Sequence, residues 1–552
     1  MTKRLSILLI IILVIWMPFA FKGTEQIIPI NDANVVVIIT AHNETLRREY
    51  GNGFSKWYKE KTGQNVTVDW RHPGGGRDII RYIDSMFINN FRFYWENTLN
   101  KRWSQKIRSA FIRLDQINPA TATSIEAEVM EAFLASNVGC EIDLLFGGGV
   151  YDHKIQAAKG FSVPSNIIHR RPDLFTDDTI PEFFAGERLW DSEGYWVGTN
   201  LTSFGIIYNA DAIKDLKVDT KPTSWMDLAD PKYFRGIAIV DPTKSSSTLK
   251  SYEMLIQQQM QMVLKEELNK SNSNEITEKM ESYAISEGWM RGLKLIQKIV
   301  ANGRYFTDSS SKTVVDVASG DCPIGIATDF YGRSQRTTLQ ERSKSDRFCF
   351  VLPKGGCSPS PDPISMFRGT KHRELAEAFI EYILSLPGQK LTGFKIGTPG
   401  GPVCAPLCRT PILKTVYSDE YSQYHNDISV NPYETTEDFI YRENWTKPVF
   451  ASLSYLFKMA FLDASEELSS AWHAIITARK EGNYEAAELA LETMSNLDDY
   501  DYETAKTDIV ALAKNKDPLE AAKQQSNITN HFRAQYKRAK MIAKRRQSKN
   551  VR

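Results

Sequence analysis

The sequence predicts an α/β protein of two or three domains that ends in an α-helical extension. Its 552 residues are too many to surround a single hydrophobic core. Short apolar runs at residues 35–40, 66–70, 204–209 and 236–240 have the length of buried strands, and residues 44–61 have the apolar spacing of a helix. Strands that alternate with helices are typical of parallel sheets covered by helices, which is why we expect an α/β fold.

The composition excludes several classes of function. Hydrophobic residues make up 42% of the chain and the formal net charge is +1, so nothing predicts nucleic acid as a general partner. The sequence has no Gly-x-Ser-x-Gly elbow, no His-Glu-x-x-His and no phosphate loop ending in Gly-Lys-Ser/Thr. Its eight histidines show no metal-binding spacing. We therefore expect that the protein is not an enzyme and carries no cofactor.

The N-terminal residues 1–22 resemble an export signal. Lys3 and Arg4 precede an apolar run from residue 5 to 21 that contains no charge. The run is shorter than the roughly 20 residues of a membrane-spanning helix. Two interpretations stay open: a cleaved signal peptide, or an N-terminal hydrophobic helix that anchors the protein in the membrane. Both predict export, to the periplasm or to the outer face of the inner membrane.

The six cysteines all follow residue 139. In an exported chain an even number of cysteines permits disulfides without defining their pairing. Cys404 and Cys408 lie in a Gly/Pro-rich loop and could form a small disulfide there. A metal site is the weaker interpretation, since no histidine lies close by and the spacing is not that of a zinc knuckle.

Two of the strand-like runs lead into polar residues that could hold a ligand. The first, residues 204–209, contains Tyr208 and ends in a turn. The second, residues 236–240, is followed by three serines, Ser245, Ser246 and Ser247, which open a predicted helix over residues 249–264. A strand, a hydroxyl-rich loop and a helix N-terminus can bind an anion. Serines are also favoured as helix caps, and the residues alone leave both interpretations open.

The order of these motifs resembles the extracellular solute-binding proteins of ABC importers. The resemblance is to the type II periplasmic-binding-protein fold, in the branch that includes ferric-iron, thiamine, polyamine and sugar-phosphate binders. It extends over residues 34–415. The segments that carry it, besides residues 196–247, are residues 38–44, 58–63, 143–149, 320–331 and 350–389.

The resemblance implies two lobes that close on a solute and then dock on a membrane permease driven by an ATPase. Lobe one would hold residues 34–203 and 346–415, with a helical insertion at about 85–118. Lobe two would hold residues 204–345. Residues 416–552 would form the helical extension, which ends in a basic tail. The small-molecule solute and the importer are the expected partners, together with the membrane if the N-terminal helix is retained.

We expect the ligand-binding residues at strand ends and helix N-termini. Glycines let backbone N–H groups approach a ligand closely, and Arg77 offers a fork for carboxylate or phosphate. The candidates in lobe one are Ala41, His42, Asn43, Gly75, Gly76, Arg77, Gly148, Gly149 and Tyr151. Those near the crossing between lobes are Thr199, Asn200 and Tyr208, and those in lobe two are Ser245, Ser246, Ser247, Asp329 and Tyr331.

The departures from the ferric binders favour an organic anion as the solute. Those proteins use two adjacent tyrosines where this chain has Phe330 and Tyr331, and a glutamate where it has glycines at 147–149. We therefore predict a phosphorylated or carboxylated compound. Two alternatives remain: a membrane-anchored ligand sensor or scaffold with the same fold, and a ferric-iron binder with an incomplete ligand set.

Two further segments have an unusual composition. Residues 85–118 are rich in aromatic and basic side chains, which could bind nucleic acid or lipid headgroups. We favour a helical hairpin that packs its aromatic stripe on lobe one. Residues 533–552 are strongly basic and contain no acid, which is typical of a solvated, frayed tail.

Overall fold

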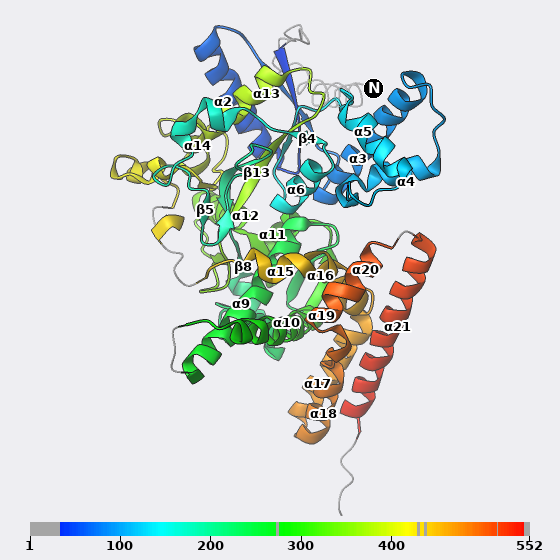
Figure 1. The fold of residues 1–552 in the computed structure, drawn as a ribbon. Helices are drawn as coiled ribbons and strands as arrows, with labels where there is room; N and C mark the ends of the chain where they lie inside the picture. Colours follow the sequence, from blue (N-terminus) through cyan, green and yellow to red (C-terminus); the bar gives the residue numbers. More distant parts are fainter. Residues whose placement is uncertain (1–33, 272–274, 428–430, 435–438, 516, 546–552) are drawn as a thin grey trace, which may run out of the picture.

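The computed structural model describes residues 34–271, 275–427, 431–434, 439–515 and 517–545. Two β-sheets form an upper and a lower body, and a group of helices extends from the lower one (Figure 1). The predicted signal peptide or anchor at residues 1–22 lies outside the described residues. No helix in the described ranges combines the length and the apolar character needed to cross a bilayer.

The larger sheet is built from two separated parts of the chain. Its strands run in the order β14-β7-β13-β3-β1-β2, and β4 pairs with β13. The pairs β1·β2 and β1·β3 are parallel, whereas β13 is antiparallel to β3, β4 and β7. The strands are β1 (Val35–Thr40), β2 (Thr67–Arg71), β3 (Leu144–Phe146), β4 (Ser162–Val163), β7 (Val197–Thr202), β13 (Ser360–Phe367) and β14 (Thr410–Pro411).

The smaller sheet contains the apolar runs after residue 203. Its order is β10-β9-β11-β8-β12, with β9 parallel to its neighbours and β8 antiparallel to β11 and β12. The chain enters it between β7 and β8 and returns to the larger sheet between β12 and β13. The strands are β8 (Phe204–Asn209), β9 (Ile237–Val240), β10 (Gly303–Thr307), β11 (Ile324–Thr328) and β12 (Phe348–Val351).

Helices cover the larger sheet, and some of them form a separate aromatic core. Phe87 and Phe91 are fully buried; the first stacks on Phe161 with ring centroids 4.0 Å apart, and the second on Phe111 at 4.4 Å. Their burial agrees with a packed helical hairpin at residues 85–118. The helices of this body are α2 (Glu44–Thr62), α3 (Gly76–Asn97), α4 (Gln105–Ile112), α5 (Ser124–Leu134), α6 (Val150–Ala158), α7 (Ile167–Arg170), α13 (Arg373–Leu384) and α14 (Leu386–Gly393).

The C-terminal helices share one hydrophobic core with the smaller sheet. Residues from β8, β9 and β11 belong to the same buried cluster as residues from 439 to 543. Figure 1 shows α21 along α17 and α18, and α17 in turn contacts α10. The mixed α/β class and the helical extension are thereby confirmed. The helices are α8 (Ala210–Asp215), α9 (Ser246–Ser271), α10 (Glu278–Ala301), α11 (Ser310–Ser319), α12 (Asp329–Ser343), α15 (Glu443–Thr446), α16 (Phe450–Leu456), α17 (Ser465–Lys480), α18 (Tyr484–Met494), α19 (Tyr502–Thr504), α20 (Val510–Ala513) and α21 (Pro518–Ala543).

The expectation of a solvated tail from residue 533 onward is wrong for residues 533–543. They belong to α21, where Tyr536 is fully buried and its hydroxyl donates to Ala460 O at 3.0 Å. Arg533 donates to Asp463 O at 2.7 Å. The basic side chains alternate with Tyr536, Ala539 and Ile542 at helical spacing, so one face of the helix is apolar even though its composition is basic. Residues 546–552 lie outside the described residues.

The segment around Tyr441 contacts both bodies. Tyr441 N–H donates to Ala185 O at 2.8 Å, between the short paired strands β5 (Phe183–Phe184) and β6 (Glu187–Arg188). Its hydroxyl donates to Glu253 of α9 at 2.8 Å. Nearby, Glu443 forms an ion pair with Lys154 of α6 at 2.8 Å. The C-terminal extension therefore joins the two bodies as well as completing the lower one.

Candidate functional site

Three helix N-termini meet where the two bodies touch. A Cβ built on Gly76, at the start of α3, would lie 3.4 Å from Ser246 Oγ, and one on Gly149, before α6, would lie 3.7 Å from Ser246 Cβ. Ser246 is the first residue of α9. Gly75 packs in the same place, with its built Cβ 3.7 Å from Lys244 O. We call Gly75, Gly76, Gly149, Asp152 and Ser246 the inter-lobe junction.

The junction has the electrostatics of an anion site. Each helix N-terminus presents N–H groups without intrahelical partners and carries roughly half a positive charge. The first turn of α9 is capped by Ser245, whose Oγ accepts from Thr248 N–H at 3.2 Å. Ser245 therefore has the capping role, whereas Ser246 faces the glycines of the other body, where a ligand contact is possible.

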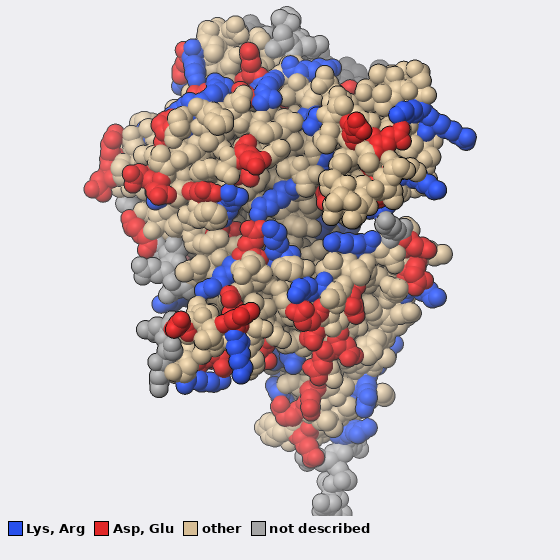
Figure 2. Space-filling model, in the orientation of Figure 1, with Lys and Arg blue, Asp and Glu red and all other residues tan. Residues whose placement is uncertain are grey.

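Arg77 and Asp152 add charges to the junction. The Nε atom of Arg77 is buried and has no hydrogen-bond partner among the described residues. Asp152 is buried and accepts a hydrogen bond from Ser246. Burial raises the pKa of Asp152, against the opposing effects of that hydrogen bond and of Arg77. Lys and Arg side chains lie along the hollowed boundary between the two bodies in Figure 2.

A second polar cluster lies at the end of β1. His42 Nε2 is 3.0 Å from Asp362 Oδ2, and His42 Nδ1 is 2.9 Å from Thr40 Oγ1. Arg409 is 2% exposed and forms an ion pair with Asp362. Burial lowers the pKa of His42 although Asp362 opposes it, so the imidazole is neutral at pH 7. Burial disfavours the charge on Asp362, but Arg409 and His42 outweigh it and hold its pKa below the ordinary value.

This second cluster also joins the two bodies. The guanidinium of Arg409 lies 4.9 Å from the ring centroid of Phe330, at the start of α12. One residue earlier, Asp329 forms an ion pair with Arg333 and accepts from Thr410 Oγ1 at 3.1 Å. Asp329, Phe330 and Arg333 come from the smaller-sheet body, whereas Arg409 and Thr410 come from the larger. In the Arg409–Asp362 and Arg333–Asp329 pairs the two charges compensate each other. The inter-lobe junction is therefore the better place for an additional anion.

Several predicted residues lie elsewhere or have structural roles. Asn43 caps α2, since its Oδ1 accepts from Leu46 N–H at 2.9 Å, and Ala41 precedes it in the partly buried loop. Thr199 donates to Asp362 O at 2.9 Å, and Asn200 accepts from Tyr50 at 2.9 Å, so both hold the larger sheet together.

Gly148, Tyr151, Ser247 and Tyr331 lie close to one of the two clusters. Gly148 adopts φ +95° in the loop before α6, and Ser247 is the second residue of α9. Tyr151 packs on Phe450 with ring centroids 5.0 Å apart. Burial raises the pKa of Tyr331 to about 12, which keeps its hydroxyl protonated.

The placement of Tyr208 near the crossing between lobes was wrong. Tyr208 pairs with Ile324 at the start of β11, whereas Phe204 pairs with Thr328 at its end, beside Asp329. Tyr208 is thus at the far end of the sheet from the inter-lobe contacts, buried in the core. The predicted disulfide is also not formed: all six cysteines are free thiols in the structure, with Cys404 exposed and Cys408 buried.

Arg409, Asp362 and Arg333 were missed as site residues. Arg409 contacts Asp362 and His42, which lie 47 and 367 residues away in the sequence. Arg333 pairs with Asp329 four residues earlier, but its contact with Thr410 spans 77 residues. Asp362 stands between two prolines, which indicate an irregular strand, and the pairing of β13 with β7 shifts register between Asp362 and Pro363. Within the described residues no group of three or more His, Cys, Asp or Glu side chains is arranged to hold a metal ion.

Comparison with known proteins supports the predicted resemblance. Residues 173–399 match the family described as bacterial extracellular solute-binding protein, so the resemblance is confirmed over that segment. This range includes β7 to β13 and therefore the Ser245–Ser247 and Asp329–Tyr331 positions. No curated protein matches the sequence.

Solved structures of periplasmic binding proteins are similar at a low level. AfuA from Actinobacillus pleuropneumoniae, with fructose 6-phosphate bound, is 15% identical with a TM-score of 0.43, over 69% of this chain and 85% of that one. Iron-bound HitA from Pseudomonas aeruginosa is 14% identical with a TM-score of 0.42, over 76% and 98%. Similarity at this level does not decide between ligands.

Proposed function

We propose that this protein is an exported solute-binding protein of an ABC importer that captures a small phosphorylated or carboxylated compound at the inter-lobe junction. The family match over residues 173–399 supports the class. The observation that carries the ligand class is the meeting of the N-termini of α3, α6 and α9 at Ser246. Three such N-termini favour negative charge without requiring a metal.

Binding requires the two bodies to move apart. Ser246 Oγ lies at van der Waals distance from the built Cβ position on Gly76, so no solute fits between them in this arrangement. In a more open form the backbone N–H groups of both glycine loops and of α9 face the gap. A solute held by both sides stabilises the partly closed form at the expense of the open one, as in hinge-type binding proteins.

Ferric iron is the second candidate, and the donor groups fit it poorly. His42 Nε2 is engaged with Asp362 and Arg409, and Tyr331 has a pKa of about 12 with phenylalanine beside it. A hard cation needs several anionic oxygens, whereas Asp362 and Asp329 are each paired with a buried arginine. A membrane-anchored sensor depends on residues 1–22 and is tested by the mass of the mature N-terminus.

A thermal-shift titration tests the proposal. The probes are inorganic phosphate, glucose 6-phosphate, citrate and ferric citrate, with glucose as the uncharged control. A ligand at a hundredfold excess over Kd adds about 2.7 kcal/mol to the free energy of unfolding. We expect at least one organic anion to raise Tm. The Arg77→Gln substitution should weaken the binding of that anion tenfold or more.

Arg81→Gln is the matched control, because Arg81 lies one turn further along α3 with a 71% exposed side chain. Equal loss in both variants, or a shift with ferric citrate alone, would contradict the anion proposal.

A further inference from the structure

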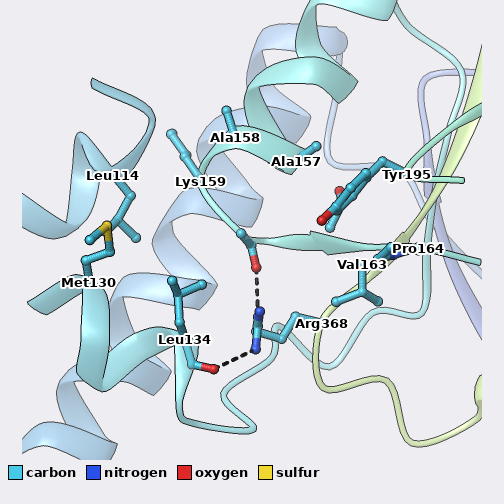
Figure 3. A pocket seen from close by; sticks show the side chains of 12 residues that line it. Leu114, Met130, Leu134, Ala157, Ala158, Lys159, Val163, Pro164, Tyr195 and Arg368 are labelled. Atoms are coloured by element: carbon cyan, nitrogen blue, oxygen red, sulfur yellow. Dashed lines mark hydrogen bonds between the residues drawn. The ribbon is translucent and has the colours of Figure 1, made fainter. Parts of the chain in front are cut away.

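A cavity of about 230 Å³ lies inside the larger-sheet body, away from the inter-lobe junction. It is lined by the ends of α5 and α6 and by β4, and Figure 3 shows Arg368 reaching into it from beyond β13. None of its lining residues belongs to the junction or to the His42 cluster. Met130, Leu134 and Val163 give it apolar walls. Its volume is below the roughly 300–1,000 Å³ of typical ligand pockets, so a ligand must be small.

Arg368 is a cation without an anionic partner. Its Nε donates to Gly160 O at 2.8 Å, and its Nη1 to Leu134 O at 3.3 Å and Ser136 O at 3.4 Å. These acceptors are neutral carbonyls, and no ion pair joins Arg368 to a carboxylate in the described ranges. A guanidinium has five N–H donors, so those of Nη2 remain for a ligand. Burial lowers the pKa of Arg368, because desolvation disfavours the charged guanidinium.

Two residues with hydroxyl groups, Ser162 and Tyr195, line the same cavity as Arg368. Ser162 is 1% exposed, and its Oγ has no hydrogen-bond partner among the described residues. A buried polar group left in this way costs about 1–3 kcal/mol, which a ligand oxygen would recover. Figure 3 shows Tyr195 with its hydroxyl directed toward the cavity. Arg368, Ser162 and Tyr195 together supply donors from three different parts of the chain.

The second cation at the cavity is already occupied. Lys159 Nζ forms an ion pair with Asp84 at 3.0 Å. One available positive charge and apolar walls match a singly charged group with an apolar tail better than a phosphate dianion. An inorganic anion would contact the guanidinium but not the apolar walls, and an uncharged apolar molecule would contact only the walls.

We propose that this cavity binds a small monocarboxylate with a short apolar tail. The carboxylate accepts from Arg368 Nη2 and from the Ser162 and Tyr195 hydroxyls, and the tail packs against Met130, Leu134 and Val163. This site is separate from the solute site of the inter-lobe junction and does not depend on it. A carboxylate here stiffens the larger-sheet body without bridging to the smaller one.

The test uses the full chain, 4-fluorobenzoate as probe and 4-fluorobenzyl alcohol as its uncharged control. Binding is followed by ¹⁹F NMR, and the location by the methyl resonance of ¹³C-labelled Met130, assigned with Met130→Leu. We expect 4-fluorobenzoate to shift that methyl resonance and to bind at least tenfold more tightly than the alcohol. Arg368→Gln should weaken the benzoate tenfold or more, and Arg92→Gln, an exposed arginine of α3, should not.

Arg368 also holds three backbone carbonyls, so its variant could unfold the protein. Tyr195→Phe keeps the packing and removes one hydrogen-bond donor. Because one hydrogen bond contributes modestly, we expect this variant to bind 4-fluorobenzoate about threefold more weakly and to bind the alcohol as the wild type does. Arg77→Gln should leave benzoate binding unchanged. No binding at concentrations on the order of 10 mM, where affinity is too weak to matter, would overturn the proposal. So would equal binding to wild type and to a folded Arg368→Gln, or a benzoate effect lost only in Arg77→Gln.

Discussion

Lys250 of α9 and Glu187 of β6 form an ion pair across the two bodies, with Nζ and Oε1 3.0 Å apart. Lys250 Nζ is also 3.0 Å from Glu253 Oε2 and lies 3.4 Å from the ring centroid of Tyr441. Glu187 and Glu253 are both buried. The contact therefore brings the larger-sheet body, the smaller-sheet body and the C-terminal extension to one buried cation.

Replacing Glu187 with glutamine tests how much this contact contributes. Glu187→Gln keeps the size and a hydrogen-bonding group for Ser360 but removes the charge opposite Lys250. Glu253 still compensates Lys250, so we expect a loss of about 1–3 kcal/mol of unfolding free energy rather than the larger cost of a fully unpaired buried charge. Urea denaturation measures it. Glu193→Gln, at an exposed position, is the control and should change stability by less than about 0.5 kcal/mol.

Gly147 is held by two separate constraints. Its φ is +87°, and a Cβ there would lie 2.8 Å from His42 Cε1. Gly482 has a similar φ of +78° but open space around it. Gly482→Ala should cost about 1–2 kcal/mol from backbone strain alone, and Gly147→Ala at least about 1 kcal/mol more, because the buried ring must move. If both variants lost the same unfolding free energy in denaturation experiments, the His42 ring would have moved aside without an energetic cost.

His153 should make the protein sensitive to acid. It is fully buried, with Nε2 3.0 Å from Gly147 O and Nδ1 2.9 Å from Ser365 Oγ, and burial lowers its pKa to about 4. A group with a depressed folded-state pKa binds its proton more tightly in the unfolded chain. Its contribution is complete above the unfolded pKa of roughly 6.5 and is lost as pH falls toward 4, in total about 3 kcal/mol.

Unfolding free energies measured between pH 4.5 and 7.5 check this expectation. His153→Gln should flatten the slope by up to one proton, and His169→Gln, at an exposed position, should not. If His153→Gln kept the wild-type slope of unfolding free energy against pH, the acid sensitivity would come from His42 or His425, whose pKa values burial also lowers.

Asp152 should oppose anion binding when it is ionised. Burial raises its pKa, and it lies at the junction beside Ser246 and Arg77. Asp152→Asn removes the negative charge and should tighten binding of the anion found in the thermal-shift titration roughly tenfold at pH 8, about 1.4 kcal/mol, with a smaller gain at pH 5.5. Isothermal titration calorimetry at both pH values measures this difference. Weaker binding at both would mean that the carboxylate accepts a hydrogen bond from the solute.

Local patterns predicted the elements well because their causes are local. The helix expected over residues 44–61 is observed at Glu44–Thr62, since Asn43 caps its start and Gly63 its end. The runs at 204–209 and 236–240 are β8 and β9, buried on both faces as continuous apolar runs require. Gly76, Gly149 and Ser246 were each chosen for their position before a helix, and the structure brings all three together.

Long-range contacts defeated the same reasoning. The sequence around Arg409 does not indicate that its side chain contacts Asp362 and His42. The sequence around Tyr208 does not indicate which end of β8 faces the other body. The basic composition of residues 533–543 hid the apolar face that packs in the C-terminal core. In each case the deciding partner is remote in sequence, so composition and spacing do not contain it.

The shared core of the smaller sheet and the C-terminal helices bears on the order in which the chain becomes stable. Trp289 and Asn302 precede residue 303, yet their partners, Tyr500 O at 3.0 Å and Trp472 Nε1 at 2.7 Å, are synthesised about 170 to 210 residues later. The smaller sheet cannot close its apolar surface until translation is nearly finished. During synthesis the apolar surface of this half of the molecule therefore stays exposed, and a chain that stops early leaves it open to proteases and to aggregation.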